Sequence, residues 1–173
     1  TQWPSSAASD VYKRQLRENK VMSLKTRFGN LGNILDFDNL TEETIYVLDS
    51  PILTNSQFKK FRKFFSKKTK VIDCTFDISS SLKDRIEAIR VEAETSVREG
   101  STCIILSDKN ISNQKATIPS ILVVGAVHSY LVKQGLRGYC SLNVECSDAL
   151  DTHSFAVLIG VGATTINPYP VSY

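Results

Sequence analysis

Residues 107–169 of the chain read SDKNISNQKATIPSILVVGAVHSYLVKQGLRGYCSLNVECSDALDTHSFAVLIGVGATTINPY. An apolar segment leads into Ser107, and two further apolar segments end at Glu145 and Asn167. Between them lie segments with helical spacing of apolar residues, and the first of these opens at Pro119, a residue suited to a first helical turn. Because one strand and helix unit repeats at short spacing, the stretch predicts an α/β fold with a parallel, barrel-like sheet.

The same patterns extend upstream and define the remaining elements. The predicted strands are 71–76, 102–106, 140–144 and 163–166, and the predicted helices are 56–66, 82–97, 119–134 and 151–159. Right-handed crossovers bring the carboxyl ends of such strands to one edge, which is where α/β proteins bind ligands. The polar residues expected at that edge are Asp77, Ser107, Asp108, Glu145 and Asn167.

Asp108 and Glu145 permit two interpretations. As a carboxylate pair with separated pKa values they could divide acid and base roles. Alternatively they cap helices or bind loop amides and lysines, which are common roles for a carboxylate beside a helix start. We favour the second interpretation and assign no catalytic residue.

The composition is that of an ordinary globular chain with one basic segment. Of 173 residues, 42% are hydrophobic and 23% are charged, which is enough for one sizeable core. Seven of the 21 basic residues fall within 59–70. The rest of the chain therefore has 14 basic and 18 acidic residues and is mildly acidic. Four phenylalanines interleave with these cations, at 58, 61, 64 and 65. Such a pattern suits a single-stranded nucleic-acid surface, but helical spacing favours rings that point into the core and lysines that face solvent.

Cysteine and histidine spacing argues against a metal site. Cys74, Cys103, Cys140 and Cys146 lie in or beside apolar segments without CxxC spacing, which predicts reduced, packed thiols in a cytosolic protein. His128 and His153, the chain's two histidines, show no ligand spacing with them or with Glu145. No apolar run approaches the roughly 20 residues of a membrane helix, and no membrane or nucleic-acid partner is predicted.

Several sequence blocks resemble the central domain of the glutamate synthase large subunit. They are LRENKVMSLKTRFGNLGN at 16–33, SPILTN at 50–55, ILSD at 105–108, IPSILVVGAVH at 118–128, SLNVE at 141–145, HSFAVLIGVGA at 153–163 and INPY at 166–169. The order of the blocks is far more specific than any one of them.

The resemblance implies a fragment of an enzyme that makes glutamate from glutamine and 2-oxoglutarate with FMN and an iron-sulfur cluster. In that family an amidotransferase domain releases ammonia, a tunnel carries it, and a flavin domain reduces the imine. The central domain is a scaffold and partial tunnel wall between them, so those two domains are the implied partners. A small subunit or ferredoxin is implied as a further partner of the parent enzyme. No cofactor is expected within this fragment, which is predicted to be inactive alone.

Three segments are expected along the chain. Residues 1–15 resemble non-native, adapter-derived sequence, 16–55 form a loop-rich connector, and 56–173 form the α/β domain, truncated at its C-terminus. In the connector, Lys25, Arg27 and Asn33 sit among glycines, which suits either contact with another domain or a packed connector.

Arg27, Asp108, Glu145 and Asn167 are therefore the candidate strand-exit or interdomain contacts. The alternatives to a glutamate synthase fragment are a stand-alone α/β barrel enzyme with its site at the strand ends, and a binding module built on the lysine-rich helix. The expected location is the cytoplasm, or the plastid stroma in a photosynthetic eukaryote.

Overall fold

The computed structural model of the chain describes residues 24–28 and 46–170. Its contacts divide the chain into two units, Thr1–Ser50 and Pro51–Tyr173. In the first unit, two short strands lie within the segment expected to be loop-rich. They are β1 (Thr26–Phe28) and β2 (Tyr46–Leu48), which pair antiparallel.

The second unit is built on a parallel sheet of four strands in the order β3-β5-β7-β8. These strands are β3 (Thr69–Asp73), β5 (Cys103–Ser107), β7 (Ser141–Cys146) and β8 (Thr165–Pro168). Each of these strands pairs in parallel with the one that follows it along the chain, β3 with β5, β5 with β7 and β7 with β8. The predicted parallel α/β architecture is therefore confirmed.

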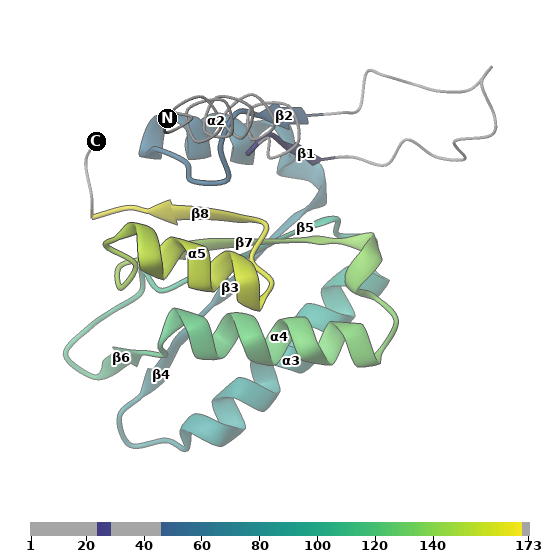
Figure 1. Ribbon diagram of the computed structural model, residues 1–173. Helices are drawn as coiled ribbons and strands as arrows, with labels where there is room; N and C mark the ends of the chain where they lie inside the picture. Colours follow the sequence, from purple (N-terminus) through teal and green to yellow (C-terminus); the bar gives the residue numbers. More distant parts are fainter. Residues whose placement is uncertain (1–23, 29–45, 171–173) are drawn as a thin grey trace, which may run out of the picture. The chain divides into compact units, whose positions relative to one another are not determined.

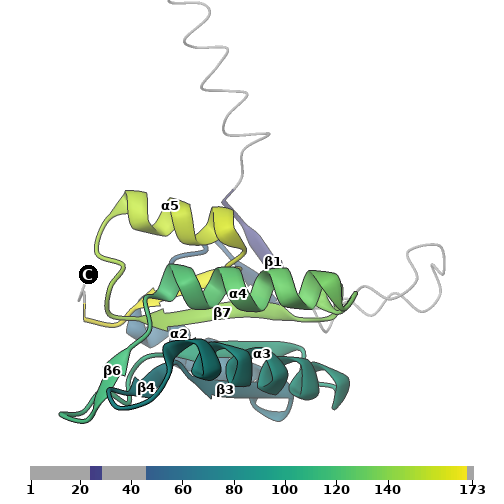
Figure 2. The same ribbon diagram turned by 90° about the horizontal axis from the view of Figure 1, so that it is seen from below.

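Helices cover both faces of this sheet. On one face lie the three crossover helices, α3 (Leu82–Arg98), α4 (Ser120–Lys133) and α5 (Thr152–Val161), whereas α2 (Asn55–Phe64) lies on the other (Figures 1 and 2). Sequential strands with their crossovers on one face are the arrangement found in barrels.

Alternation along the strands gives the two faces different chemistry. The strand residues that pack under α3, α4 and α5 are apolar and at most 2% exposed: Ile72, Ile104, Leu106, Leu142, Val144 and Ile166. The intervening positions, which face the α2 side, include Cys103, Ile105, Asn143 and Thr165, all buried. Here α2 contributes its two buried phenylalanines, Phe58 and Phe61.

Local signals start and end the helices. Thr54 and Gln57 form a reciprocal capping box at α2, with the Thr54 amide donating to Gln57 Oε1 at 2.9 Å. At α3 the Ser81 hydroxyl accepts from the Asp84 amide, and Gly100 follows the helix with φ +95°. That conformation is readily reached by glycine.

The predicted strand 71–76 is wrong in its second half, because the chain bends at Cys74. Asp73 Oδ1 accepts hydrogen bonds from the Thr75 amide at 2.9 Å and hydroxyl at 2.8 Å. The Arg85 guanidinium of α3 donates to the carbonyls of Asp73 at 2.6 Å and Thr75 at 3.0 Å. These bonds turn the backbone out of the sheet, so that only Asp73 and the residues before it belong to β3.

Beyond the bend the chain forms an antiparallel pair of strands that was not expected from the sequence. It consists of β4 (Thr75–Asp77) and β6 (Lys115–Thr117), with Asp77 opposite Lys115. The placement of Asp77 at the carboxyl edge of the main sheet was therefore wrong. Asp73 occupies that position instead.

Candidate functional site at the carboxyl edge of the sheet

The strand register sets four polar side chains side by side where the parallel strands end. Asp73 pairs with Ser107, Ser107 with Glu145, and Glu145 with Asn167. Asp108 follows Ser107 directly. The structure thus brings Ser107, Asp108, Glu145 and Asn167 together at one edge of the sheet, which we call the carboxyl edge.

Glu145 is a buried carboxylate whose charge is balanced. It is 3% exposed, and its Oε2 accepts from the Ser107 hydroxyl at 2.8 Å while Oε1 accepts from Lys109 Nζ at 2.6 Å. The same ammonium lies 4.8 Å from the centroid of the Tyr169 ring. Charge-assisted hydrogen bonds of this length are among the stronger ones. Lys109 and Tyr169 were missed as partners because nothing in the local sequence links them to Glu145.

Asp108 ties the loop after β7 to the end of β5. It is 5% exposed, and its Oδ2 accepts from both the amide and the hydroxyl of Ser147, at 2.8 and 2.7 Å. Burial, followed by the neighbouring carboxylates of Asp108 and Glu145, raises the pKa of Tyr169 above its ordinary value. The Tyr169 phenol therefore stays protonated at neutral pH. Asp108 Oδ1 accepts no hydrogen bond from the described residues.

Asn167 binds the chain where α2 begins. Its Nδ2 donates to the Leu53 carbonyl at 2.9 Å and to Asn55 Oδ1 at 3.1 Å, and Asn55 in turn donates to the Tyr169 carbonyl at 3.1 Å. Asn167 is 1% exposed, and its Oδ1 has no partner within the described part of the chain. This side chain therefore holds together segments 114 residues apart.

Asp73 is held as a carboxylate by its neighbours. Partial burial opposes its ionisation, yet hydrogen bonds from Asn110 and Thr75 keep its pKa below the ordinary value. Its role is to fix the bend after β3.

The N-terminus of α4 is capped from a distance. Pro119 offers no side-chain acceptor, so Asp148 from the loop after β7 accepts from the Ser120 amide at 2.8 Å and from its hydroxyl at 2.7 Å. The start of the helix was predicted from the sequence, but its capping residue was not. The available signal was Pro119 at the N-cap, because proline has no side-chain acceptor and a distant residue must then accept the hydrogen bond from the first turn.

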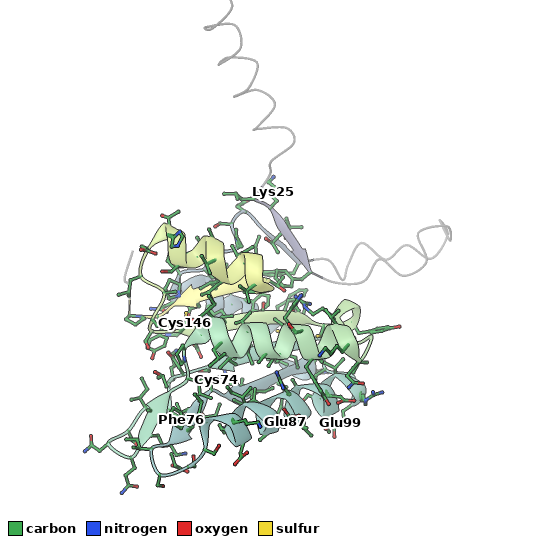
Figure 3. All side chains as sticks on the ribbon, turned by 60° about the horizontal axis from the view of Figure 1, so that its bottom comes forward. Lys25, Cys74, Phe76, Glu87, Glu99 and Cys146 are labelled. Atoms are coloured by element: carbon green, nitrogen blue, oxygen red, sulfur yellow. The ribbon has the colours of Figure 1, made fainter. Side chains whose placement is uncertain are left out.

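A small cavity lies between the carboxyl edge and the start of α4. Its lining includes Cys74, Leu106, Asp108, Val124 and Cys146, with the two cysteines labelled in Figure 3. It offers room for about one water molecule. A flavin does not fit there.

The cysteines likewise do not fit an iron-sulfur cluster. All four are free and buried, which confirms the predicted packed thiols. Burial raises the pKa of Cys74 and of Cys146 to about 12, so both are protonated thiols at neutral pH. Within residues 24–28 and 46–170, no group of three histidine, cysteine or acidic side chains is placed to hold a metal ion.

The two histidines lie apart from the carboxyl edge. His128 is on α4, where its Nδ1 accepts from Arg137 Nε at 3.1 Å, and His153 is exposed in the first turn of α5. Asp108 and Glu145 are both nearly inaccessible and already bound to loop donors or to Lys109. The two carboxylates thus bind a loop serine and a lysine.

The residues singled out in the connector are only partly described. Arg27 lies in β1 of the first unit, opposite Val47 of β2. Asn33 lies outside the described residues. No helix in the described part of the chain is both long and apolar enough to cross a membrane.

Comparison with known proteins identifies the family. The sequence family described as glutamate synthase central domain matches residues 14–172. The NADPH glutamate synthase large chain of Azospirillum brasilense is 49% identical over 157 residues. The chloroplastic ferredoxin-dependent glutamate synthase of Spinacia oleracea is 36% identical over 160 residues, and the NADPH large chain of Bacillus subtilis is 36% identical over 158. Each alignment covers 89% of this chain and 10% of the relative, so the chain spans about a tenth of the length of these proteins. This chain belongs to the glutamate synthase central domain family.

Proposed function

We propose that these residues form part of the central domain of a glutamate synthase large chain and act there as a scaffold. The parent enzyme would make glutamate from glutamine and 2-oxoglutarate, with FMN and an iron-sulfur cluster held in other parts of the polypeptide. The relatives named above, all glutamate synthases, support this assignment. In this proposal the domain lies between the amidotransferase and FMN domains and contributes part of the wall of the ammonia tunnel.

The observation that carries the scaffold role is the bonding at the carboxyl edge. The carboxylates and amides that could face a substrate instead tie loops to strands, through Ser147, Lys109 and Leu53. Such buried hydrogen bonds rigidify a structure, even though Asp108 Oδ1 and Asn167 Oδ1 have no partner among the described residues. They leave little capacity for acid–base chemistry.

We further propose that the carboxyl edge contacts a neighbouring domain. Lys109 is 45% exposed in its side chain and sits above the buried Glu145, so it presents a positioned charge at the surface. Asp108 and Asn167 would support that surface from below. Arg27 of the first unit is proposed as a second interdomain contact.

The proposal is tested first with the 173-residue chain itself. Glutamine hydrolysis and FMN binding are expected to be undetectable, and either activity in this chain would overturn the scaffold assignment. Its intact mass also matters, because the protein isolated from its source should be far larger than 19.3 kDa.

A second test uses the complete large chain. Glu145→Gln should lower glutamate formation from glutamine more than formation from added ammonium, because a disturbed scaffold uncouples two distant sites. Glu99→Gln, on an exposed helix end, is the matched control and should change neither rate. Equal losses with both nitrogen donors would instead indicate a direct role in the reductive step.

The stand-alone barrel enzyme is not favoured. Its site would need accessible groups at the strand ends, yet Asp108, Glu145 and Asn167 are at most 5% exposed.

A further inference from the structure

The α2 helix and the turn after it carry a dense positive charge. We call its exposed cations the basic face, which consists of Lys59, Lys60, Arg62, Lys63, Lys67 and Lys68. The next cation along the chain, Lys70, is bound to Glu92 at 3.4 Å. No acidic residue occurs in the sequence between Asp49 and Asp73, so no local counter-charge is available.

The fold does not require this charge. The capping box starts the helix, and Phe58 and Phe61 anchor it against the sheet. Cations spaced four residues apart on one helix, such as Lys59 and Lys63, repel each other and destabilise it.

Helix α3 shows what a solvent-facing helix in this protein looks like. It carries charges of both signs, and two pairs are bonded along the helix: Arg90 to Glu87 at 2.8 Å and Arg98 to Glu94 at 2.8 Å. Figure 3 labels Glu87 on this helix and Glu99 at its C-cap. The contrast indicates that the basic face is adapted to something other than water.

An exposed aromatic ring accompanies the basic face. Phe64 is 52% exposed, so the expectation that all four rings point into the core was wrong for this one. It packs edge-on against Phe65, with the ring centroids 4.9 Å apart. Aromatic and arginine side chains are enriched at the centres of protein interfaces. Single-stranded nucleic acid would call for several exposed rings, because successive bases stack on them.

We propose that the basic face, with Phe64, docks onto an acidic surface of another domain in the same long polypeptide. The partner is placed in the same polypeptide because the relatives are about ten times longer than this chain and contain the region that matches it within one polypeptide. Because the basic face is positively charged, the partner surface must be acidic. The inference rests on the proposed function in one respect, since it requires that these residues belong to a longer polypeptide.

The test measures lysine reactivity in the intact long polypeptide. Lysine acetylation is followed residue by residue with mass spectrometry, using the exposed Lys83 of α3 and Lys133 of α4 as controls. Lys59, Lys60 and Lys63 should react several-fold more slowly than the controls. Carbodiimide, which joins touching amines and carboxylates, should link them to acidic residues outside these 173. Reactivity equal to the controls, without such links, would overturn the proposal.

Charge-reversed variants provide the second measurement. The double substitution Lys59→Glu and Lys63→Glu should abolish the cross-links and restore solvent-like reactivity to Lys60, whereas Lys83→Glu should do neither. All three positions are exposed, so folding should survive the changes. Cross-links unchanged by the double substitution would contradict docking through this face.

Two other outcomes separate the possible failures. If the source encodes only the short chain, the proposed function fails along with the docking. If the long chain makes glutamate while its α2 lysines stay fully reactive, only the docking fails. Binding of oligo-dT to the short chain, with a steep loss of affinity in salt, would overturn the acidic-domain assignment in favour of nucleic acid.

Discussion

The two faces of the four-stranded sheet are stabilised in different ways. Under α3, α4 and α5 the buried side chains of the sheet are mainly aliphatic, such as Ile104 and Leu142, and their contribution depends on buried area and close packing. On the α2 side, Asn143 and Thr165 are fully buried and bonded to each other, with the Thr165 hydroxyl donating to Asn143 Oδ1 at 2.7 Å. Asn143 Nδ2 donates in turn to the Ile104 carbonyl at 3.2 Å and the Ser141 hydroxyl at 3.0 Å.

This difference predicts different responses to substitution. An apolar face loses stability in proportion to the volume removed. A polar face loses most when one partner of a pair is removed, and little when both are replaced together. The carboxyl edge continues the chemistry of the polar face.

Removing volume from the apolar face should have the largest effect. We expect Leu142→Ala to lower the free energy of unfolding by about 2–5 kcal/mol, because Leu142 is fully buried in the main core. Urea denaturation measures the change. Leu150→Ala is the matched control, since Leu150 is 60% exposed and should lose no more than about 0.5 kcal/mol. Similar losses for both variants would show that the core is looser than its burial indicates.

Removing one side chain of the Asn143 and Thr165 pair should destabilise the fold less than Leu142→Ala, and it should show that the two side chains depend on each other. We expect Asn143→Leu to cost about 1–3 kcal/mol, because the Thr165 hydroxyl and the Ile104 carbonyl then lose a buried partner. Thr165→Val in the same chain should recover part of that loss, and a double-mutant cycle measures the coupling. Strictly additive effects would contradict a paired polar face.

Much of this fold could be predicted from the sequence because its signals are local. The apolar segments at 102–106 and 140–144 and the helical spacing at 82–97 are each short-range patterns, and the structure has a strand or a helix at each. A repeated strand and helix unit then leaves few topologies open.

The rest depended on contacts that no local pattern encodes. The bend after β3 requires Arg85, which reaches back 12 residues to the Asp73 carbonyl. Lys109 and Glu145 are 36 residues apart, and Asn167 bonds to Leu53 across 114. The carboxyl edge could thus be located from the sequence, but its bonding could not.

Breaking the ion pair at the carboxyl edge should have an intermediate effect. We expect Lys109→Met to cost about 1–2 kcal/mol, because Glu145 is buried while Lys109 is half exposed and water can partly replace it. The double variant Lys109→Met and Glu145→Gln should be more stable than Lys109→Met alone, since position 145 then holds no buried charge without its lysine. Lys133→Met, at an exposed position, is the control and should leave the unfolding midpoint unchanged. A double variant no more stable than the single one would mean that Glu145 is hydrated without its lysine.

The smallest expected effect is a pH dependence of the folding stability that arises from His128 of α4, on the side of the sheet covered by α3, α4 and α5. Burial, followed by the charge of Arg137, lowers the pKa of His128 below its ordinary value of 6.5. Neutral His128 accepts a hydrogen bond from Arg137 Nε at 3.1 Å, and the protonated ring cannot. As the pH falls below about 6.5 the unfolded chain therefore takes up a proton that the folded chain refuses, and folding stability declines until the folded pKa is passed. Above that range the contribution of His128 is fully present.

This decline should be less than about 1 kcal/mol, because the imidazole is partly exposed and screened by solvent. Free energies of unfolding measured between pH 5 and pH 8 should show it, and His128→Gln should flatten the curve because glutamine keeps an acceptor without titrating. His153→Gln removes the other histidine, which is exposed in α5, and should leave the slope unchanged. If His153→Gln flattens the curve and His128→Gln does not, the Arg137 contact does not couple protonation to folding. The stability of the face covered by α3, α4 and α5 would then not depend on pH in this range. That face would depend on apolar packing alone, unlike the face that carries Asn143 and Thr165.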